Sequence, residues 1–228
     1  MMLKNPKFKF VSNSYSPGGL PEQTRWDSRV RDLRESHPNF LFPTHYTSQG
    51  RVVDFRSKSC DFPIQVYTDS GAIASKKHEI GTSKLMGCFG VFISGPNGNA
   101  LIHMTPKTKL GYEIRPEFNY LERSMSVIAP TLSALGPLED CQMVLLANMV
   151  DSRYKEEHQT ELRAVTEAFK NFGIGHVKVV GDMPLIETTL YFSPERPNEL
   201  LALGRDTAYD SVGDTIIIGG LREHWISF

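Results

Sequence analysis

Residues 86–105 read MGCFGVFISGPNGNALIHMT, and this stretch decides the fold class. Two apolar runs, residues 86–94 and 100–105, flank the turn signal Gly95-Pro96-Asn97-Gly98. Apolar β-rich runs on either side of an Asn-Gly turn are typical of a β-hairpin. The centre of the chain is therefore predicted to be an antiparallel pair of strands.

The register of this hairpin decides which side chains meet across it. If residues 97–98 form a two-residue turn, Cys88 lies about 13 Å along the strand from the position opposite His103. If residues 94–97 form a four-residue loop, Cys88 lies directly opposite His103, with Cβ atoms about 4.5–5.5 Å apart. The second register is favoured because it moves Pro96, which has no amide hydrogen, out of the ladder.

Strand-like and helical segments surround the hairpin. Strands are expected at residues 52–55, 62–68, 141–150, 176–180, 188–193, 199–203 and 215–218. A helix is predicted from Asp151 or Ser152 as N-cap to Gly173, because Leu162, Val165, Phe169 and Phe172 follow helical spacing. Another helix is predicted over much of residues 120–135, where Pro130 must kink or split it.

Consecutive strands interrupted by few helices favour an α+β fold, in which a β-sandwich of mixed or antiparallel strands is flanked by helices. No GxGxxG or GxxxxGK[ST] motif follows a strand, so a nucleotide-binding doubly wound sheet is disfavoured. Residues 1–50 are rich in Ser, Pro, Gly and Asn and are expected to form an extension. One short helix is predicted there, beginning near Pro21, and residues 51–228 are expected to form the main domain.

Composition restricts the function classes. The chain has 228 residues, 40% hydrophobic and 22% charged, and 25 Lys and Arg against 26 Asp and Glu give a net charge of −1. No apolar run approaches the ~18–20 residues of a membrane span, and the near-neutral charge gives no nucleic-acid footprint. The start of the chain lacks a signal-peptide pattern, so the protein is expected in the cytoplasm or exported by another route into a target cell.

Three cysteines are present, Cys60, Cys88 and Cys141. An odd, sparse count without a CxxC pair argues against a disulfide framework and against structural zinc. No metal or cofactor is expected. Cys60 and Cys141 are interpreted as structural residues.

Cys88 and His103 are the candidate chemical pair. A thiol attacks as the thiolate, and a nearby imidazole can take its proton and later deliver it to a leaving amine. Gly87 and Gly90 flank Cys88, so the backbone there can approach a substrate closely.

The segment Leu85-Met86-Gly87-Cys88, followed by a strand, a glycine turn and His103, resembles the core of the cysteine–histidine glutamine deamidases. This superfamily includes the chemotaxis receptor deamidase CheD and the cytotoxic necrotizing factor and lethal-factor toxins. The toxin branch is similar at Leu-Ser-Gly-Cys, with Met86 in place of the Ser. Thr82 stands where CheD proteins carry a Thr before the Cys.

The resemblance implies a thiol-dependent hydrolase that converts a glutamine of a target protein to glutamate and ammonia. Cys88 is then the nucleophile, His103 the general base and acid, and Thr82 the residue that orients His103. The backbone amides of Cys88 and its neighbour Gly87 form the oxyanion pocket. The implied partner is a protein with an exposed glutamine, and no cofactor is required.

Three functions are consistent with the sequence. The first is a protein-glutamine deamidase, used either as a toxin or effector or in a housekeeping role. The second is a binding module that keeps the same sandwich without turnover, with Cys88 buried. The third is another cysteine hydrolase such as a peptidase. The sequence gives neither the target protein nor the oligomeric state.

Overall fold

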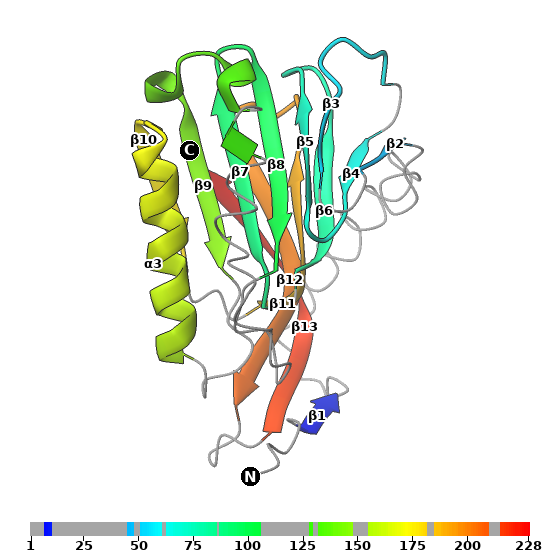
Figure 1. Ribbon diagram of the computed structural model, residues 1–228. Coiled ribbons are helices and arrows are strands. Elements are labelled where there is room, and N and C mark those ends of the chain that lie inside the picture. The colour runs from blue at the N-terminus through cyan, green and yellow to red at the C-terminus, as the bar shows by residue number, and fades with distance from the viewer. Residues whose placement is uncertain are drawn as a thin grey trace.

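Two mixed β-sheets, of seven and six strands among the described residues, form the body of the protein (Figure 1). The computed structural model describes residues 7–10, 45–47, 51–60, 63–85, 87–105, 128–129, 132–147, 155–181, 185–209 and 215–228. Parallel and antiparallel pairs occur in both sheets, so the chain has the predicted α+β fold.

The larger sheet is built from strands at both ends of the chain. In spatial order these are β1 (Lys7–Phe10), β13 (Thr215–Ser227), β12 (Glu199–Tyr209), β11 (Leu185–Phe192), β6 (Ile80–Leu85), β4 (Ile64–Val66) and β2 (His45–Tyr46). The first fifty residues supply β1 and β2, which occupy the two edges of this sheet. Each is parallel to its neighbour, β13 or β4.

The smaller sheet contains the hairpin. Its order is β10 (His176–Val180), β9 (Gln142–Ala147), β7 (Phe89–Gly95), β8 (Gly98–Met104), β5 (Ser70–Ala74) and β3 (Val52–Asp54). Strands β7 and β8 are therefore central, and nearly every residue in them is buried. An apolar hairpin of this kind suits a sheet that is covered on both faces.

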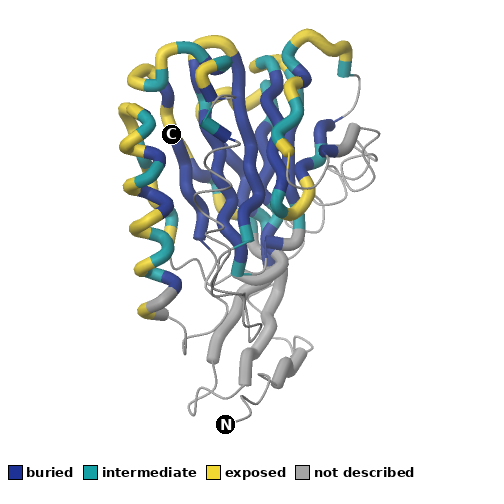
Figure 2. The backbone as a smooth tube through the Cα atoms, in the orientation of Figure 1, coloured by how far each residue is buried: buried dark blue, intermediate teal, exposed yellow. Residues whose placement is uncertain are grey.

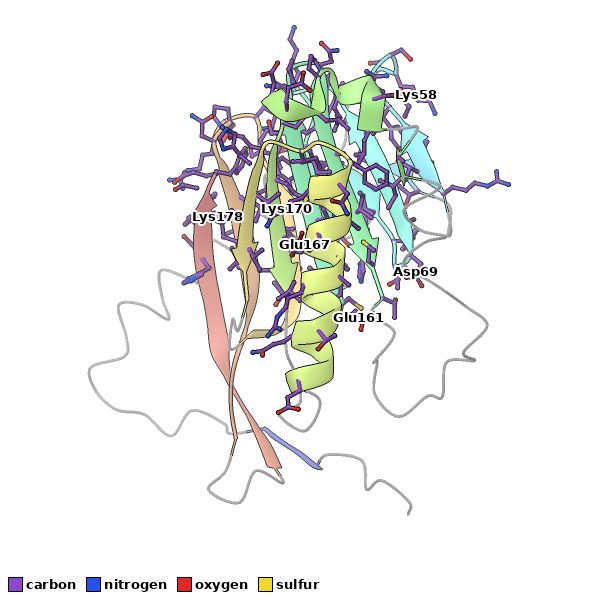
Figure 3. All side chains as sticks on the ribbon, turned by 60° about the vertical axis from the view of Figure 1, so that its left-hand side comes forward. Lys58, Asp69, Glu161, Glu167, Lys170 and Lys178 are labelled. Atoms are coloured by element: carbon purple, nitrogen blue, oxygen red, sulfur yellow. The ribbon has the colours of Figure 1, made fainter. Side chains whose placement is uncertain are left out.

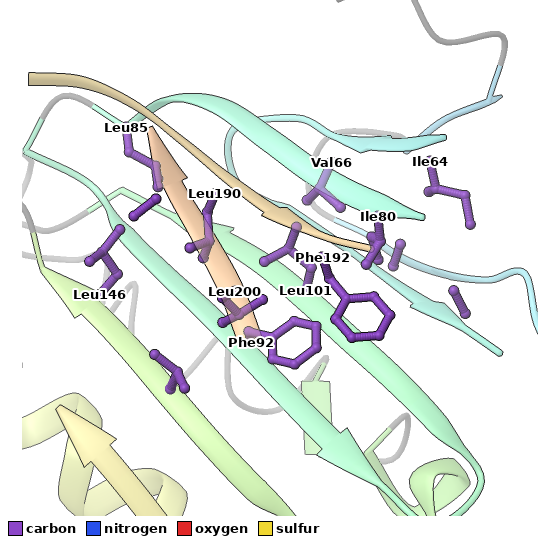
Figure 4. Close-up of a cluster of buried hydrophobic side chains, with 14 of the residues drawn as sticks. Ile64, Val66, Ile80, Leu85, Phe92, Leu101, Leu146, Leu190, Phe192 and Leu200 are labelled. Carbon is purple, nitrogen blue, oxygen red and sulfur yellow. The ribbon is translucent and has the colours of Figure 1, made fainter. Parts of the chain in front are cut away.

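One hydrophobic cluster lies between the sheets and makes them a sandwich. Figure 4 shows Ile80, Leu190 and Phe192 from the larger sheet meeting Phe92 and Leu101 from the smaller one. All five side chains are at most 1% exposed. Removal of these large apolar side chains from water is the main contribution to the free energy that holds the two sheets together.

A second cluster covers the other face of the smaller sheet. Helix α3 (Lys155–Asn171) contributes Val165 and Phe169 to this cluster, and its opposite face is exposed (Figure 2). Figure 3 shows Glu167 and Lys170 on the helix, where they form an ion pair of 3.1 Å. Gly173, with φ 94°, follows the helix in the left-handed conformation that favours glycine. The helix and its glycine stop are confirmed, while the predicted N-caps Asp151 and Ser152 lie outside the described residues.

The hairpin itself is confirmed, but both predicted registers are wrong. Gly95 pairs with Gly98, so Pro96 and Asn97 form a two-residue turn and Gly90 lies opposite His103. The amide of Asn97 donates to the carbonyl of Leu135 at 2.9 Å. A Cβ on Gly95 would lie 2.7 Å from the same carbonyl. Contacts with a distant segment therefore fix this turn. The sequence of residues 86–105 alone contains no information on these contacts.

Other predictions have mixed outcomes. The strand at residues 141–150 is confirmed as β9, which lies between β7 and β10. Strands β5 and β6 were not predicted, because their sequences SGAIA and IGTSKL are short and contain small or polar residues. The predicted helix near Pro21 lies outside the described residues. Of the predicted helix at 120–135, the structure describes residues 128–129 and 132 as α-helical and Ser133–Leu135 as a 3₁₀ helix, η1, while the other residues lie outside the described ranges.

Candidate active site

Thr82, Cys88 and His103 come from three consecutive segments that end near one another. Thr82 lies in β6 of the larger sheet, His103 in β8 of the smaller sheet, and Cys88 directly precedes β7. Cys88 packs in the cluster between the sheets, and His103 follows Leu101 of that cluster by two residues. Alternate residues of a strand face the same side, so His103 also faces the interior of the sandwich.

A hydrogen bond connects the two sheets at this point. Thr82 Oγ1 lies 2.8 Å from His103 Nδ1 and donates to the carbonyl oxygen of Val66 at 2.7 Å. A hydroxyl has one proton, which Thr82 gives to Val66, so it must accept the hydrogen bond from His103 Nδ1. Neutral His103 consequently carries its proton on Nδ1, and its Nε2 is the basic nitrogen.

Cys88 lies diagonally from His103 across the hairpin. Gly90 is opposite His103, and Cys88 is two residues before Gly90. Diagonal neighbours in an antiparallel pair are about 7–8 Å apart at Cα, which is within reach of a long or aromatic side chain such as an imidazole. The hairpin thus brings the thiol and the imidazole to one end of the same interior face.

Two glycines shape the backbone around Cys88. Gly87 has φ 66°, in the left-handed region, and this conformation turns the chain immediately before Cys88. Gly90 allows close contact between the sheets, because a Cβ there would lie 3.0 Å from Leu85 Cδ1 and 3.1 Å from Leu190 Cδ2. Met86 lies outside the described residues, so its replacement of the toxin-branch Ser has no structural account here.

A buried hydroxyl pair flanks His103 on its other side, and sequence reasoning missed it. Ser70 pairs with His103 across β5 and β8. Its Oγ donates to the carbonyl of Tyr67 at 2.6 Å and lies 2.5 Å from Thr47 Oγ1. Because the Ser70 proton is used on Tyr67, Thr47 is the donor between the two hydroxyls. No sequence pattern predicted this pair, since Thr47 and Ser70 are distant residues brought together by β2 and β5.

Asp69 fixes the end of the strand that carries His103. Its Oδ1 accepts a hydrogen bond from the backbone amide of Thr105 at 2.9 Å. Asp69 has φ 54°, a conformation that Asp tolerates better than most residues. Figure 3 shows it at the start of β5, at the edge of the described sandwich. The Asp69 carboxylate thus connects Thr105, the residue after β8, to the turn that precedes β5.

The candidate site is buried. Thr82, Cys88 and His103 are each 1% exposed. A protein substrate would therefore reach the thiol only if the chain around it moved. The same burial places the three side chains in a medium of low dielectric constant, where hydrogen bonds and charges act more strongly than in water.

The other two cysteines are structural in their surroundings. Cys60 is partly buried and packs against the cluster between the sheets. Cys141 is fully buried, and its Sγ lies 3.5 Å from the carbonyl of Pro137. Burial, with the negative charges of Asp140 and Glu139, raises the pKa of the Cys141 thiol. Both cysteines keep the structural interpretation that the sequence suggested.

Within the described ranges, no three His, Cys, Asp or Glu side chains lie close enough to hold a metal ion. No helix of the described residues is long and apolar enough to cross a membrane. His158, on α3, is buried against Phe89 with ring centroids 5.0 Å apart, on the opposite face of the sheet from His103. It is therefore not part of the candidate site.

No protein-family model and no curated protein matches this sequence. Among solved structures, the chain is similar to Neisseria meningitidis protein NMB0706, of the family DUF152. That match has 14% identity and a TM-score of 0.39, and it covers 70% of this chain and 69% of that one.

The chain is also similar to the C-terminal domain of CNFy from Yersinia pseudotuberculosis, with 9% identity and a TM-score of 0.37. This match covers 72% of the present chain and 61% of the CNFy domain. Neither likeness assigns a role to any residue of this chain.

Proposed function

We propose that this protein is a thiol-dependent hydrolase that deamidates a glutamine side chain in a target protein. The hydrogen bond from His103 Nδ1 to Thr82 Oγ1 is the observation that carries the proposal. It makes Nε2 the basic nitrogen of an imidazole that shares an interior face with the Cys88 thiol. The Leu85-x-Gly87-Cys88 motif points to the same chemistry.

The reaction has two stages. His103 Nε2 takes the proton of Cys88, and the thiolate attacks the carboxamide carbon of the glutamine. The resulting tetrahedral intermediate collapses, the imidazolium protonates its nitrogen, and the C–N bond breaks to release ammonia and leave the thioester. His103 then takes a proton from water, hydroxide attacks the thioester carbon, and the C–S bond breaks to give glutamate and the free thiol.

Thr82 and the backbone at Gly87 have supporting roles in this mechanism. Thr82 acts as a positioning residue, because it holds the ring and tautomer of His103 through a hydroxyl that is itself fixed by Val66. The backbone amides of Gly87 and Cys88 stabilise the oxyanion, a contribution of about 3–4 kcal/mol per donor in other enzymes. The left-handed Gly87 sets the direction of these amides.

The burial of Cys88 favours a second candidate function. A thiol that is 1% exposed in a hydrophobic cluster is typical of a packing residue. The protein would then be a binding module that uses the sandwich as a scaffold without turnover. The reactivity of the Cys88 thiol and the mass of the target protein after incubation distinguish this function from the hydrolase.

The test incubates the protein with candidate target proteins and measures ammonia release and intact target mass. Deamidation adds the mass difference between OH and NH₂ without cleavage, whereas a peptidase yields fragments. Cys88→Ser and His103→Ala are expected to abolish the change, and Cys141→Ser is the matched control that retains it. Turnover that persists in Cys88→Ser would rule out the proposal, and cleavage in place of deamidation would reassign the enzyme as a peptidase.

A further inference from the structure

A polar cavity of about 300 Å³ opens at the other end of the sandwich from the candidate active site. Ser94, Gly95 and Pro96 line it, so it lies beside the β7–β8 turn, and that turn is at the top of the view in Figure 1. Asn99, one of its lining residues, precedes His103 on β8 by four residues, or about 13 Å along the strand. The cavity is therefore separate from Cys88, Thr82 and His103.

Asn99 is the unusual residue of this cavity. It lies in a central strand, paired with Ser94 on one side and Ala74 on the other, and is 1% exposed. Within the described residues, neither its Oδ1 nor its Nδ2 has a hydrogen-bond partner. Asparagine is disfavoured in strands, and a buried carboxamide without partners is costly. Both atoms are also buried, so a group that enters the cavity reaches them only when the Asn99 side chain turns toward it. Satisfying both atoms in this way would offset the cost.

Two packed aromatic rings form part of the cavity wall. Phe192 lines the cavity and stacks on Phe92 with ring centroids 5.3 Å apart. Phe228 lines it as well, and its ring lies 5.2 Å from that of Phe92. The backbone amide of Phe228 donates to the carbonyl of Asn198, another lining residue, at 3.1 Å. The aromatic part of the wall is therefore packed against the cluster between the sheets.

The polar lining selects the ligand class. A carboxamide offers a donor beside an acceptor, so another amide can bind it with two parallel hydrogen bonds, whereas a carboxylate or an ammonium group satisfies only one of its atoms. Lys76 and Asp140 also line the cavity, and they complement the carboxylate and the ammonium group of an amino acid. The volume is at the small end of the ~300–1,000 Å³ range of ligand pockets.

From these features we infer that the cavity binds an amide-bearing α-amino acid, with Asn99 as the residue that recognises the amide. Lys76 and Asp140 hold the charged end of the ligand near the mouth. Because both charged side chains are exposed, binding weakens as salt is added. The inference stands independently of the hydrolase proposal, since it uses none of the three candidate catalytic residues.

The test is an NMR titration of the full ¹⁵N-labelled chain carrying Cys88→Ser, which prevents turnover of the probe. L-glutamine and L-asparagine are added, and the side-chain NH₂ signals of Asn99 are followed. At least one of the two is expected to shift these signals saturably. L-norleucine, which lacks the amide, is expected to bind at least tenfold more weakly.

Variants localise the site. Asn99→Leu, which is close in volume, is expected to weaken binding at least tenfold, and Lys76→Gln, at an exposed position, about threefold. Asn97→Ala, in the exposed turn outside the cavity, is the matched control and retains binding. The inference is overturned if neither amino acid shifts Asn99 saturably, if Asn99→Leu binds as tightly as the parent, or if uridine or adenosine binds there more tightly than both amino acids.

Discussion

Thr82 and His103 belong to different sheets, and their hydrogen bond of 2.8 Å spans the interior of the sandwich. The same threonine hydroxyl donates to Val66 on the neighbouring strand β4. One side chain therefore couples the tautomer of a buried histidine to the packing of two layers. Its substitution has consequences for stability as well as for chemistry.

Thr82→Val keeps the shape of the side chain but removes its hydroxyl. The carbonyl of Val66 and Nδ1 of His103 both lose this partner in a buried site, so we expect a loss of about 1–3 kcal/mol in the free energy of unfolding. Urea denaturation measures the change. Thr82→Ser, which keeps the hydroxyl, should lose less stability and retain more activity than Thr82→Val. Equal losses in the two variants would show that the hydroxyl is unimportant.

Gly90→Ala tests the close contact between the sheets. The added methyl group would lie 3.0 Å from Leu85 Cδ1 and 3.1 Å from Leu190 Cδ2, so the sheets must separate or both leucines must move. Overpacking of this kind costs about 1–3 kcal/mol. Gly181→Ala is the control, because its nearest atom, Leu162 Cδ2, is 3.8 Å away. Thermal unfolding should show a lower Tm for the first variant alone.

Gly87→Ala tests the turn before Cys88. At φ 66° an alanine is strained by about 1–2 kcal/mol, and relief of that strain would redirect Cys88. Asparagine tolerates the left-handed conformation, so Gly87→Asn should keep most of the stability and of the Cys88 reactivity. Urea denaturation and a thiol-labelling rate measure both effects. If Gly87→Ala and Gly87→Asn have the same stability and the same labelling rate, the left-handed conformation of Gly87 is not what positions Cys88.

Local pattern was sufficient for the fold class but insufficient for the register of the central hairpin. The apolar runs around 95–98 predict two strands, and the structure contains both. The turn is fixed by contacts of Gly95 and Asn97 with Leu135, which is about forty residues away in the sequence. A pairing that depends on such a contact cannot be obtained from the hairpin sequence alone, because a shift of register keeps the same local propensities.

The candidate site was predictable to different degrees at its different residues. Cys88 and His103 stand in a motif, so residue types and spacing were enough to single them out. Thr82 was placed only through a family resemblance, since the strand that carries it, β6, has no clear alternation. Thr47 and Ser70 meet only when β2 and β5 are placed in different sheets. Asn99 was not singled out by the sequence, because its surroundings depend on how the two sheets pack.

Cys141 gives a pH dependence with a definite sign. Burial and the acidic residues Asp140 and Glu139 raise the pKa of its thiol in the folded state above the ordinary value of 9.0. The unfolded chain therefore ionises first as pH rises, so the stability contribution is complete below about 9 and is lost as pH rises toward the folded value. Unfolding free energies measured from pH 7 to 10 should fall more steeply for the parent than for Cys141→Ala. If the unfolding free energies of the parent and of Cys141→Ala change with pH in the same way, the raised pKa of Cys141 is contradicted.

Cys88 and Cys141 form an internal comparison for the proposed chemistry, because they are 1% and 0% exposed respectively. Access to a small reagent is therefore similar, and any difference in rate reflects the thiolate fraction. If His103 takes the proton of Cys88, iodoacetamide at neutral pH labels Cys88 faster than Cys141, and His103→Ala slows the labelling of Cys88 while leaving that of Cys141 unchanged. Peptide mass spectrometry gives both rates in one sample, with Cys60 as the partly exposed reference. Equal rates at Cys88 and Cys141 would leave the binding module as the better account of the fold, since a packed thiol without an active base has no catalytic use.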